Sequence, residues 1–143
     1  MKKVILGLLV LGTTVMTSCK KEGCTDPDST TYNADAKKDD GTCNFQGEVV
    51  FWYGQTESNL LVNDGATTLT FYVDGEIVGS TATSVYWTAS PTCGSNASIT
   101  VTKNLGGVKT QSYSYRVEDQ TGWEYYNGTL NFNANSCFAL ELN

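Results

Sequence analysis

The segment Leu69-Thr70-Phe71-Tyr72-Val73-Asp74-Gly75-Glu76-Ile77-Val78 gives the clearest fold signal in the chain. Asp-Gly between two β-prone runs is typical of a tight hairpin turn, because Gly75 can take the positive φ angle that such turns need. Leu69, Phe71 and Val78 can then share one face of the two strands. The segment predicts a β-hairpin with one apolar face turned toward a core.

Short β-prone runs alternate with turn signals on both sides of this hairpin, over residues 45–143. Tyr, Trp, Thr and Val are frequent there, and no stretch has a sustained helical period. We expect strands at 46–53, 67–73, 77–83, 84–89, 97–103, 111–118, 123–132 and 137–142. The pattern predicts an all-β domain, a small antiparallel β-sandwich.

The predicted core consists of the apolar residues that these strands place toward the inside. They are Val49, Phe51, Leu69, Phe71, Val73, Val78, Ile99, Val101, Tyr113, Tyr115, Val117, Leu130, Phe132, Leu140 and Leu142. A core of this size fits one domain of about 100 residues.

Residues 1–18 have the organisation of a signal peptide. A positive end at Lys2 and Lys3 is followed by an apolar region that glycine and threonine interrupt, and then by the small residues Thr17 and Ser18. A transmembrane anchor is the alternative, but crossing the hydrocarbon core takes about 20 apolar residues, and this run is shorter. A removable leader is therefore expected to end immediately before Cys19.

Met16, Ser18 and Cys19 resemble the lipobox of bacterial lipoproteins, with Met16 in place of the more usual Leu. The resemblance implies a diacylglyceryl thioether on Cys19, cleavage before it, and acylation of the new amine by a fatty acid such as palmitate. Two or more acyl chains anchor a protein stably, whereas a single chain holds it only marginally. We therefore expect a lipid on Cys19 to attach the mature protein to a membrane.

Lys20 follows this cysteine, at the position where lipoproteins retained in the inner membrane carry Asp. The resemblance therefore implies the outer membrane. Lys20-Lys21-Glu22 is also similar to the charged tripeptide that exports Bacteroidetes lipoproteins to the cell surface. The periplasmic and the external face both stay open as locations.

Residues 19–44 form the predicted anchor and acidic module. Between Cys24 and Cys43 the sequence has one aromatic residue and no apolar period, so burial of apolar surface cannot hold it together. A bond between the two cysteines is the expected substitute, and closing such a loop contributes on the order of 3 kcal/mol in the chain-entropy model. Asp40-Gly41 marks a turn that brings Cys43 back to Cys24.

The same block contains, in order, Cys24-Thr25-Asp26-Pro27, Tyr32, Ala36, Asp39-Asp40-Gly41 and Cys43. This order resembles a short module of secreted Bacteroidetes proteins, whose members look like calcium-binding or spacer elements. The oxygen donors for calcium would be Asp26, Asn33, Asp35, Asp39 and Asp40, in a spacing that differs from an EF-hand loop. A solvated acidic spacer that lifts the domain off the membrane is the alternative.

Cys93, in a Pro-Thr-Cys-Gly turn, and Cys137, at the start of the last predicted strand, form the second predicted pair. Their bond would tie the final strand to the middle of the domain and contribute roughly 4 kcal/mol. Four cysteines allow three pairings, and we choose 24 with 43 and 93 with 137 because each pair brackets a self-contained block. A zinc site is the alternative, but the chain has no His and no Cys-x-x-Cys pair.

Several short stretches of the domain occur in a distinctive order: residues 47–52, 72–80, 91–94, 113–115 and 128–129, then Cys137 and residues 140–142. Together they resemble an uncharacterised Bacteroidetes lipoprotein domain that is similar in architecture to prealbumin-like and carboxypeptidase-regulatory-like sandwiches. The resemblance implies a prealbumin-like or immunoglobulin-like β-sandwich and an extracytoplasmic address. It implies no particular activity.

The composition argues against two classes of function. The chain carries 15 Asp plus Glu against 9 Lys plus Arg, so it lacks the clustered cations that bind phosphates, and no nucleic acid partner is expected. It has no His, and every Cys already has an assigned role, so the usual catalytic bases and nucleophiles are missing. Carboxylate pairs such as Glu118 with Asp119 are left for glycosidase chemistry, but adjacent acids on a small sandwich are usually solvated edges.

We therefore predict a non-catalytic function, the binding of an extracellular glycan or protein. Trp87 and Trp123 lie beside predicted turns and are the expected ligand-binding residues, with ordinary core packing as the alternative for such rings. A structural or accessory subunit of a cell-envelope assembly, with the acidic module as spacer or calcium site, is the second predicted function.

Overall fold

The computed structural model describes residues 20–143. The predicted leader at 1–18 and the predicted lipidation site Cys19 lie outside the described residues. Among the residues that are described, no helix has both the length and the apolar character needed to cross a membrane. The elements are β1 (Phe45–Trp52), α1 (Gln55–Asn63), β2 (Thr68–Val73), β3 (Glu76–Ala82), β4 (Ile99–Gly106), β5 (Thr110–Asp119), β6 (Glu124–Asn133) and β7 (Cys137–Glu141).

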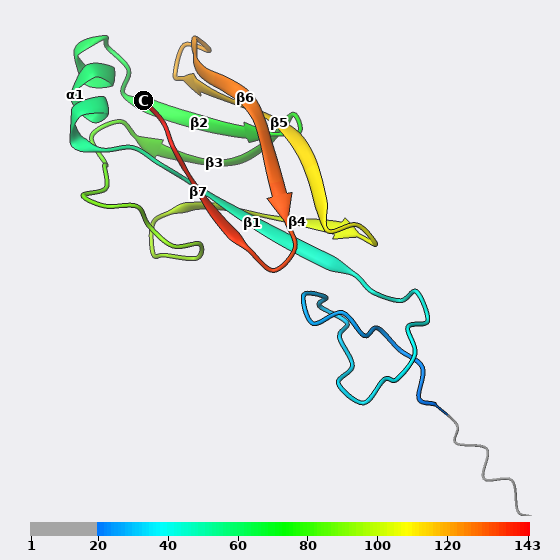
Figure 1. Cartoon of the computed structure of the whole chain (residues 1–143). Helices are drawn as coiled ribbons and strands as arrows, with labels where there is room; N and C mark the ends of the chain where they lie inside the picture. Colours follow the sequence, from blue (N-terminus) through cyan, green and yellow to red (C-terminus); the bar gives the residue numbers. More distant parts are fainter. Residues whose placement is uncertain (1–19) are drawn as a thin grey trace, which may run out of the picture.

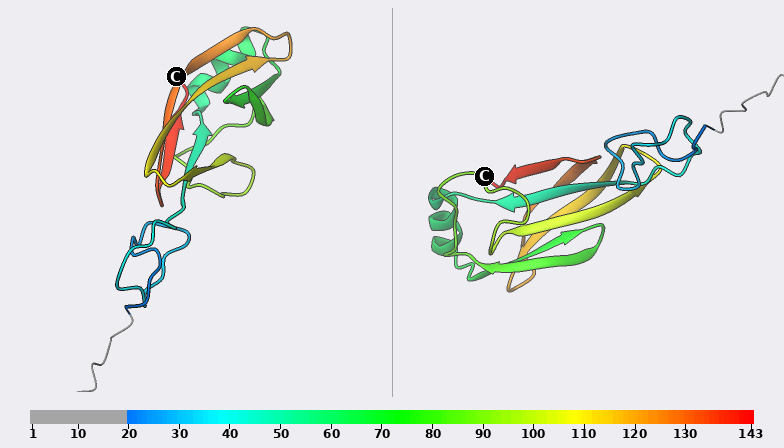
Figure 2. Two further views of the ribbon diagram at one scale, coloured as in Figure 1. Left: turned by 90° about the vertical axis from the view of Figure 1, so that its right-hand side faces the viewer. Right: turned by 90° about the horizontal axis from the view of Figure 1, so that it is seen from below.

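The strands form two sheets that pack on each other, which confirms the predicted all-β sandwich (Figures 1 and 2). One sheet has the strand order β4-β1-β7 and the other has the order β3-β2-β5-β6. All neighbouring strands are antiparallel except β1 and β7, which run parallel. The last strand thus completes the sheet that the first strand began.

The core lies between the two sheets. Phe51 of β1 packs against Phe71 of β2 and Tyr115 of β5, with ring centroids 5.3 and 5.6 Å apart. Every predicted core residue is buried or half-buried. Burial of one such large apolar side chain contributes about 1.5–3 kcal/mol. Within residues 45–143, the buried apolar core residues that were not predicted are Phe45, Val50, Tyr53, Leu61, Ala66 and Leu105.

The predicted hairpin joins β2 to β3. Asp74 and Gly75 both have positive φ angles, 57° and 79°, which is the backbone of a type I′ turn. A bulge in the register next to Phe71 places Tyr72 opposite Ile77. Phe71 faces the core and Tyr72 the other side, as the alternation of a strand requires.

The prediction of a strand at 84–89 is wrong. These residues belong to the loop between β3 and β4, and they form no ladder with a neighbouring strand. The backbone N–H of Trp87 donates one hydrogen bond to the carbonyl oxygen of Tyr53, at 3.0 Å. A run of β-prone residues without a second strand to pair with stays irregular, because β-propensity depends on neighbours.

Helix α1 was not predicted. Its nine residues bury only Ser58 and Leu61, so the sequence shows no helical period. The Ser58 hydroxyl donates a hydrogen bond to the Thr83 carbonyl at 2.7 Å, and the buried Thr83 hydroxyl donates to the Ala66 carbonyl at 2.7 Å. These contacts hold the helix across one end of the sandwich, so tertiary interactions rather than local propensity account for it.

Residues 20–44 form an irregular module at the opposite end of the molecule from α1, where the chain enters β1 (Figure 1). The module has only isolated bridges, Glu22 with Lys38 and Cys24 with Tyr32. Disulfides join Cys24 to Cys43 and Cys93 to Cys137, which confirms the predicted pairing. Cys24 is almost fully buried, so the first disulfide is the centre of the module.

Candidate binding surface

Two of the predicted calcium donors are paired with lysines. Asp35 Oδ2 accepts a hydrogen bond from Lys21 Nζ at 2.8 Å, and Asp26 Oδ2 lies 2.7 Å from Lys109 Nζ. Hydrogen bonding to these ammonium groups lowers the pKa of both carboxyls. Both side chains already have a cationic partner within the protein.

The other three donors cap short turns. Asp39 Oδ1 accepts the N–H of Gly41 at 2.8 Å, and Asn33 Oδ1 accepts the N–H of Asp35 at 3.1 Å. Asp40 Oδ1 accepts the Thr42 hydroxyl at 2.6 Å, which lowers the pKa of Asp40. Within residues 20–143 no three acidic or thiol side chains are grouped as a metal site requires. Calcium binding stays a prediction.

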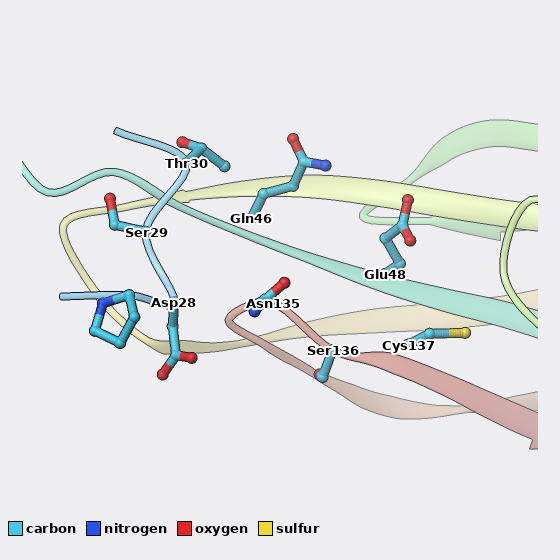
Figure 3. A pocket seen from close by; sticks show the side chains of 9 residues that line it. Asp28, Ser29, Thr30, Gln46, Glu48, Asn135, Ser136 and Cys137 are labelled. Atoms are coloured by element: carbon cyan, nitrogen blue, oxygen red, sulfur yellow. The ribbon is translucent and has the colours of Figure 1, made fainter. Parts of the chain in front are cut away.

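A polar hollow of about 300 Å³ lies between the module and the domain (Figure 3). Residues of the module, of β1 and of the turn between β6 and β7 surround it: Pro27, Asp28, Ser29, Thr30, Gln46, Glu48, Asn135, Ser136 and Cys137. The Asn135 N–H donates to the Gln46 carbonyl at 2.8 Å, and the Ser29 hydroxyl donates to the Asn44 carbonyl at 2.8 Å. The lining has no aromatic or large apolar side chain, unlike that of most ligand pockets. We therefore regard this hollow as a gap between the module and the domain and not as a ligand site.

The two predicted ligand-binding tryptophans are not brought together. Trp87 is half-buried and lines a narrow crevice with Tyr53 and Phe71, at the edge of the core. Trp123 is 67% exposed and lies in the turn between β5 and β6. This turn lies in the part of the domain that α1 closes, away from the module (Figure 1). Trp123 is therefore the tryptophan that is free to contact a ligand.

The turn that carries Trp123 is held from within. Asp119 Oδ1 accepts hydrogen bonds from the N–H groups of Thr121 at 2.7 Å and Trp123 at 3.0 Å, and from the Thr121 hydroxyl. The hydroxyl bond is the main reason that the pKa of Asp119 is lowered. The indole is exposed, but the backbone beneath it is fixed.

Two further contacts join this turn to the segment after α1. The Tyr125 hydroxyl donates to Asp64 Oδ2 at 2.6 Å, which raises the pKa of Tyr125 to about 12. The Gln120 side chain accepts the N–H of Thr67 at 2.9 Å and donates to the Gly65 carbonyl at 3.1 Å. The end of α1 and the turn between β5 and β6 thus form one surface.

This surface contains two adjoining hollows that share Gly65. One, of about 430 Å³, is lined by Asp64, Asp119, Gln120, Thr121, Trp123 and Tyr125 as well. The other, of about 270 Å³, is lined by Val62, Ala66, Thr67, Thr83 and Ser84 as well. We call the group Val62, Asp64, Gly65, Gln120, Trp123 and Tyr125 the distal surface. Exposed apolar side chains rimmed by polar groups are typical of an interaction site.

Sequence reasoning selected Trp123 as a ligand-binding candidate, which stays a prediction, and did not select Val62, Asp64, Gly65 or Gln120. The adjacent apolar residues Leu60, Leu61 and Val62 in a polar stretch were the available signal, because a short helix can bury only one of them. Comparison with protein-family models, with curated proteins and with solved structures finds no match to this chain.

Proposed function

We propose that the chain is a lipid-anchored, non-catalytic binding module of the outer membrane or cell surface, which holds an extracellular protein partner on its distal surface. The observation that carries this proposal is Trp123, 67% exposed on a turn whose backbone is fixed by Asp119. A large apolar ring in water has no benefit for folding, whereas Trp is the residue most enriched at the energetic centres of protein interfaces.

The position of the distal surface supports the proposal. The N-terminal module lies at one end of the molecule, and α1 with the turn between β5 and β6 lies toward the other (Figure 2). A lipid on Cys19 would hold the module end at the membrane. The distal surface would then point away from the membrane, toward partners outside.

A protein partner fits this surface better than a glycan. The surface combines Trp123 with Val62, a 48% exposed aliphatic residue. Aliphatic contacts complement the apolar core of a protein interface, which a polar rim such as Asp64 and Gln120 surrounds. The absence of His from the sequence supports a role without catalysis.

Crosslinking on intact cells tests the proposal. Partners crosslinked to the wild-type chain are quantified by mass spectrometry and compared with those of Trp123→Ala and Val62→Asp. Each variant should lose the partner roughly tenfold or more, as expected for a central interface residue. Val108→Asp is the matched control, because Val108 is 52% exposed on the turn between β4 and β5, outside the distal surface. Equal capture by all four proteins would refute the protein-binding role.

The second candidate function is an accessory subunit of an envelope assembly, with the module as spacer or calcium site. The contact of Lys109 with Asp26 and Asp28 favours it, because a spacer transmits position only when it is joined firmly to what it carries. This role predicts loss of the assembly when the module, residues 20–44, is shortened. The binding role predicts that a shortened module lowers partner access but leaves affinity in detergent unchanged.

A further inference from the structure

The outward face of the β3-β2-β5-β6 sheet carries a row of four dissimilar side chains. The strand register places Ile77, Tyr72, Arg116 and Asn127 side by side, one from each strand. Neighbouring strands lie about 4.8 Å apart, so the row crosses the sheet over roughly 14 Å. Val117, the next residue along β5, is fully buried. Because successive side chains of a strand point to opposite faces, Arg116 points outward. We call these four residues the cross-sheet row.

Arg116 is held in place by two neighbours. Its Cζ lies 3.8 Å from the centroid of the Tyr72 ring, and its Nε donates a hydrogen bond to Glu118 Oε1 at 2.5 Å. A guanidinium has five N–H donors in a rigid plane, so four remain on the two Nη atoms. Within residues 20–143 the Nη atoms donate to no protein acceptor. The arginine is fixed but most of its donors are unused.

A hollow of about 430 Å³ lies beside this arginine on the same face. Tyr72, Arg116 and Asn127 of the row line it, and Gly75 of the β2–β3 turn adds no side chain to fill it. Ser114 and Thr129 are partners in the β5–β6 ladder and also line the hollow.

These hydroxyls differ from others on the same face. Farther along the same two strands, the Ser112 hydroxyl donates to Asn131 Oδ1 at 2.6 Å, and the Thr110 hydroxyl donates to Asn133 Oδ1 at 2.8 Å. Ser114 and Thr129 have no such bond within the described residues 20–143. The side-chain hydroxyls of Ser112 and Thr110 are thus hydrogen-bonded within the protein, whereas those of Ser114 and Thr129 at the hollow can bond to a ligand.

The charges of the hollow argue against an anionic ligand. Arg116 supplies one positive charge, already paired with Glu118, and Glu124 adds a second carboxylate that accepts a bond from Asn127 Nδ2 at 2.6 Å. The local formal charge is therefore negative. Donors and acceptors nevertheless alternate closely, as is suitable for the hydroxyl groups of a sugar, each of which both donates and accepts.

We propose that the cross-sheet row and its hollow bind a neutral glycan. Sugar hydroxyls accept from the Arg116 Nη groups and donate to Asn127 and Glu124, and the exposed Ile77, beside the half-buried Tyr72, contacts the apolar face of a neighbouring sugar ring. This site is separate from the distal surface and does not depend on the protein partner proposed above.

Affinity electrophoresis of the detergent-purified full chain tests the site, in gels cast in turn with a neutral β-glucan, mannan or xylan, or with anionic polygalacturonate. At least one neutral polysaccharide should retard the wild-type chain. Arg116→Ala and Tyr72→Ala should weaken the retardation roughly tenfold, as the loss of a charged hydrogen-bond donor or its support implies. Arg116→Lys should weaken it as much, because lysine keeps the charge but not the planar fork.

Two control variants separate this site from other surfaces. Ser112 lies on the same face, but its hydroxyl is hydrogen-bonded to Asn131 and not to the hollow. Ser112→Ala should therefore leave the retardation unchanged. Trp123→Ala should also leave it unchanged, so failure of the protein-binding proposal would not affect this result. Circular dichroism confirms that each variant is folded. The proposal is overturned if no neutral polysaccharide retards the folded chain, if polygalacturonate retards it more strongly, or if Arg116→Ala behaves as wild type.

Discussion

Lys109 Nζ lies 2.7 Å from Asp26 Oδ2, although 83 residues separate the two in the sequence. The same ammonium group lies 2.9 Å from Asp28 Oδ2 and 5.6 Å from the centroid of the Phe45 ring. Because Lys109 belongs to the turn between β4 and β5, it joins the N-terminal module to the domain. The paired carboxylates raise the pKa of Lys109 and keep it charged.

Lys109→Ala should loosen the module without unfolding the domain. Amide hydrogen exchange should become faster at Thr30, whose N–H donates to the Asn44 carbonyl, while the melting temperature of the domain changes little. High salt should have the same effect on the wild-type chain, because it screens exposed ion pairs. Lys103→Ala is the control, since the Lys103 ammonium lies over the Tyr113 ring of the domain, 4.9 Å from its centroid. Unchanged exchange at Thr30 would show that the internal hydrogen bonds of the module do not depend on Lys109.

The two disulfides should have different effects when they are removed. Replacing Cys93 and Cys137 by alanine should lower the free energy of unfolding of the domain by roughly 4 kcal/mol, because the bond closes a long loop onto β7. Replacing Cys24 and Cys43 should instead expose residues 20–44 to proteases and leave most of the domain's urea transition in place. Urea titration followed by Trp fluorescence measures the free energy of unfolding of the domain in both double variants. Equal losses would mean that module and domain unfold as one unit.

Tyr125 should titrate near pH 12. Its hydrogen bond to Asp64 stabilises the protonated phenol and raises the pKa above the usual 10. The unfolded chain therefore loses this proton at lower pH, so the stabilisation is complete below pH 10 and is lost as the pH rises through about 12. Absorbance titration of tyrosinate in wild type and Tyr125→Phe identifies this group. Asp64→Asn should return its pKa toward 10, and no difference between Asp64→Asn and wild type would contradict the assignment.

If Cys19 is lipidated, this residue should determine whether the protein is attached to a membrane. The wild-type chain should fractionate with membranes and enter the detergent phase on phase separation, because several acyl chains bind a bilayer stably. Cys19→Ala should abolish the lipid and leave unprocessed precursor or soluble protein. Intact mass spectrometry checks the prediction directly. A mature chain that begins elsewhere and carries no lipid would be incompatible with it.

Calcium binding by the module predicts a rise in melting temperature at millimolar calcium that a chelator reverses. An Asp39→Ala, Asp40→Ala double variant should lose the rise, because both carboxylates would be ligands. A Glu76→Ala, Glu141→Ala double variant is the matched loss of two negative charges, at exposed positions of β3 and β7 outside the module. An equal rise in all three proteins would point to general charge screening, and no rise in any of them would leave the spacer as the role of the module.

Local patterns predicted most strands of the sandwich to within a few residues. The Asp74-Gly75 turn and the alternation of Leu69, Phe71 and Val73 are short-range signals, because side-chain direction in a strand depends only on position along it. The same local reasoning wrongly predicted a strand at 84–89 and did not predict helix α1. Whether a β-prone run finds a partner strand, and whether a weak helix is held by Thr83, depends on residues distant in the sequence.

The sequence by itself determined the all-β sandwich and most of its core, because apolar alternation and turn residues are properties of nearby positions. It predicted the disulfide pairing that the structure has, but four cysteines allow three pairings, and only the tertiary structure decided among them. The sequence placed Trp123 at the start of a predicted strand, beside a turn, whereas the structure has this residue in the turn before β6. Only the tertiary structure decided that this turn meets the end of α1 through Tyr125 and Asp64, and that Lys109 meets Asp26. Hydrogen bonds and ion pairs act between atoms a few ångströms apart in space, and no local pattern records which distant segments the packing of two sheets brings within that range.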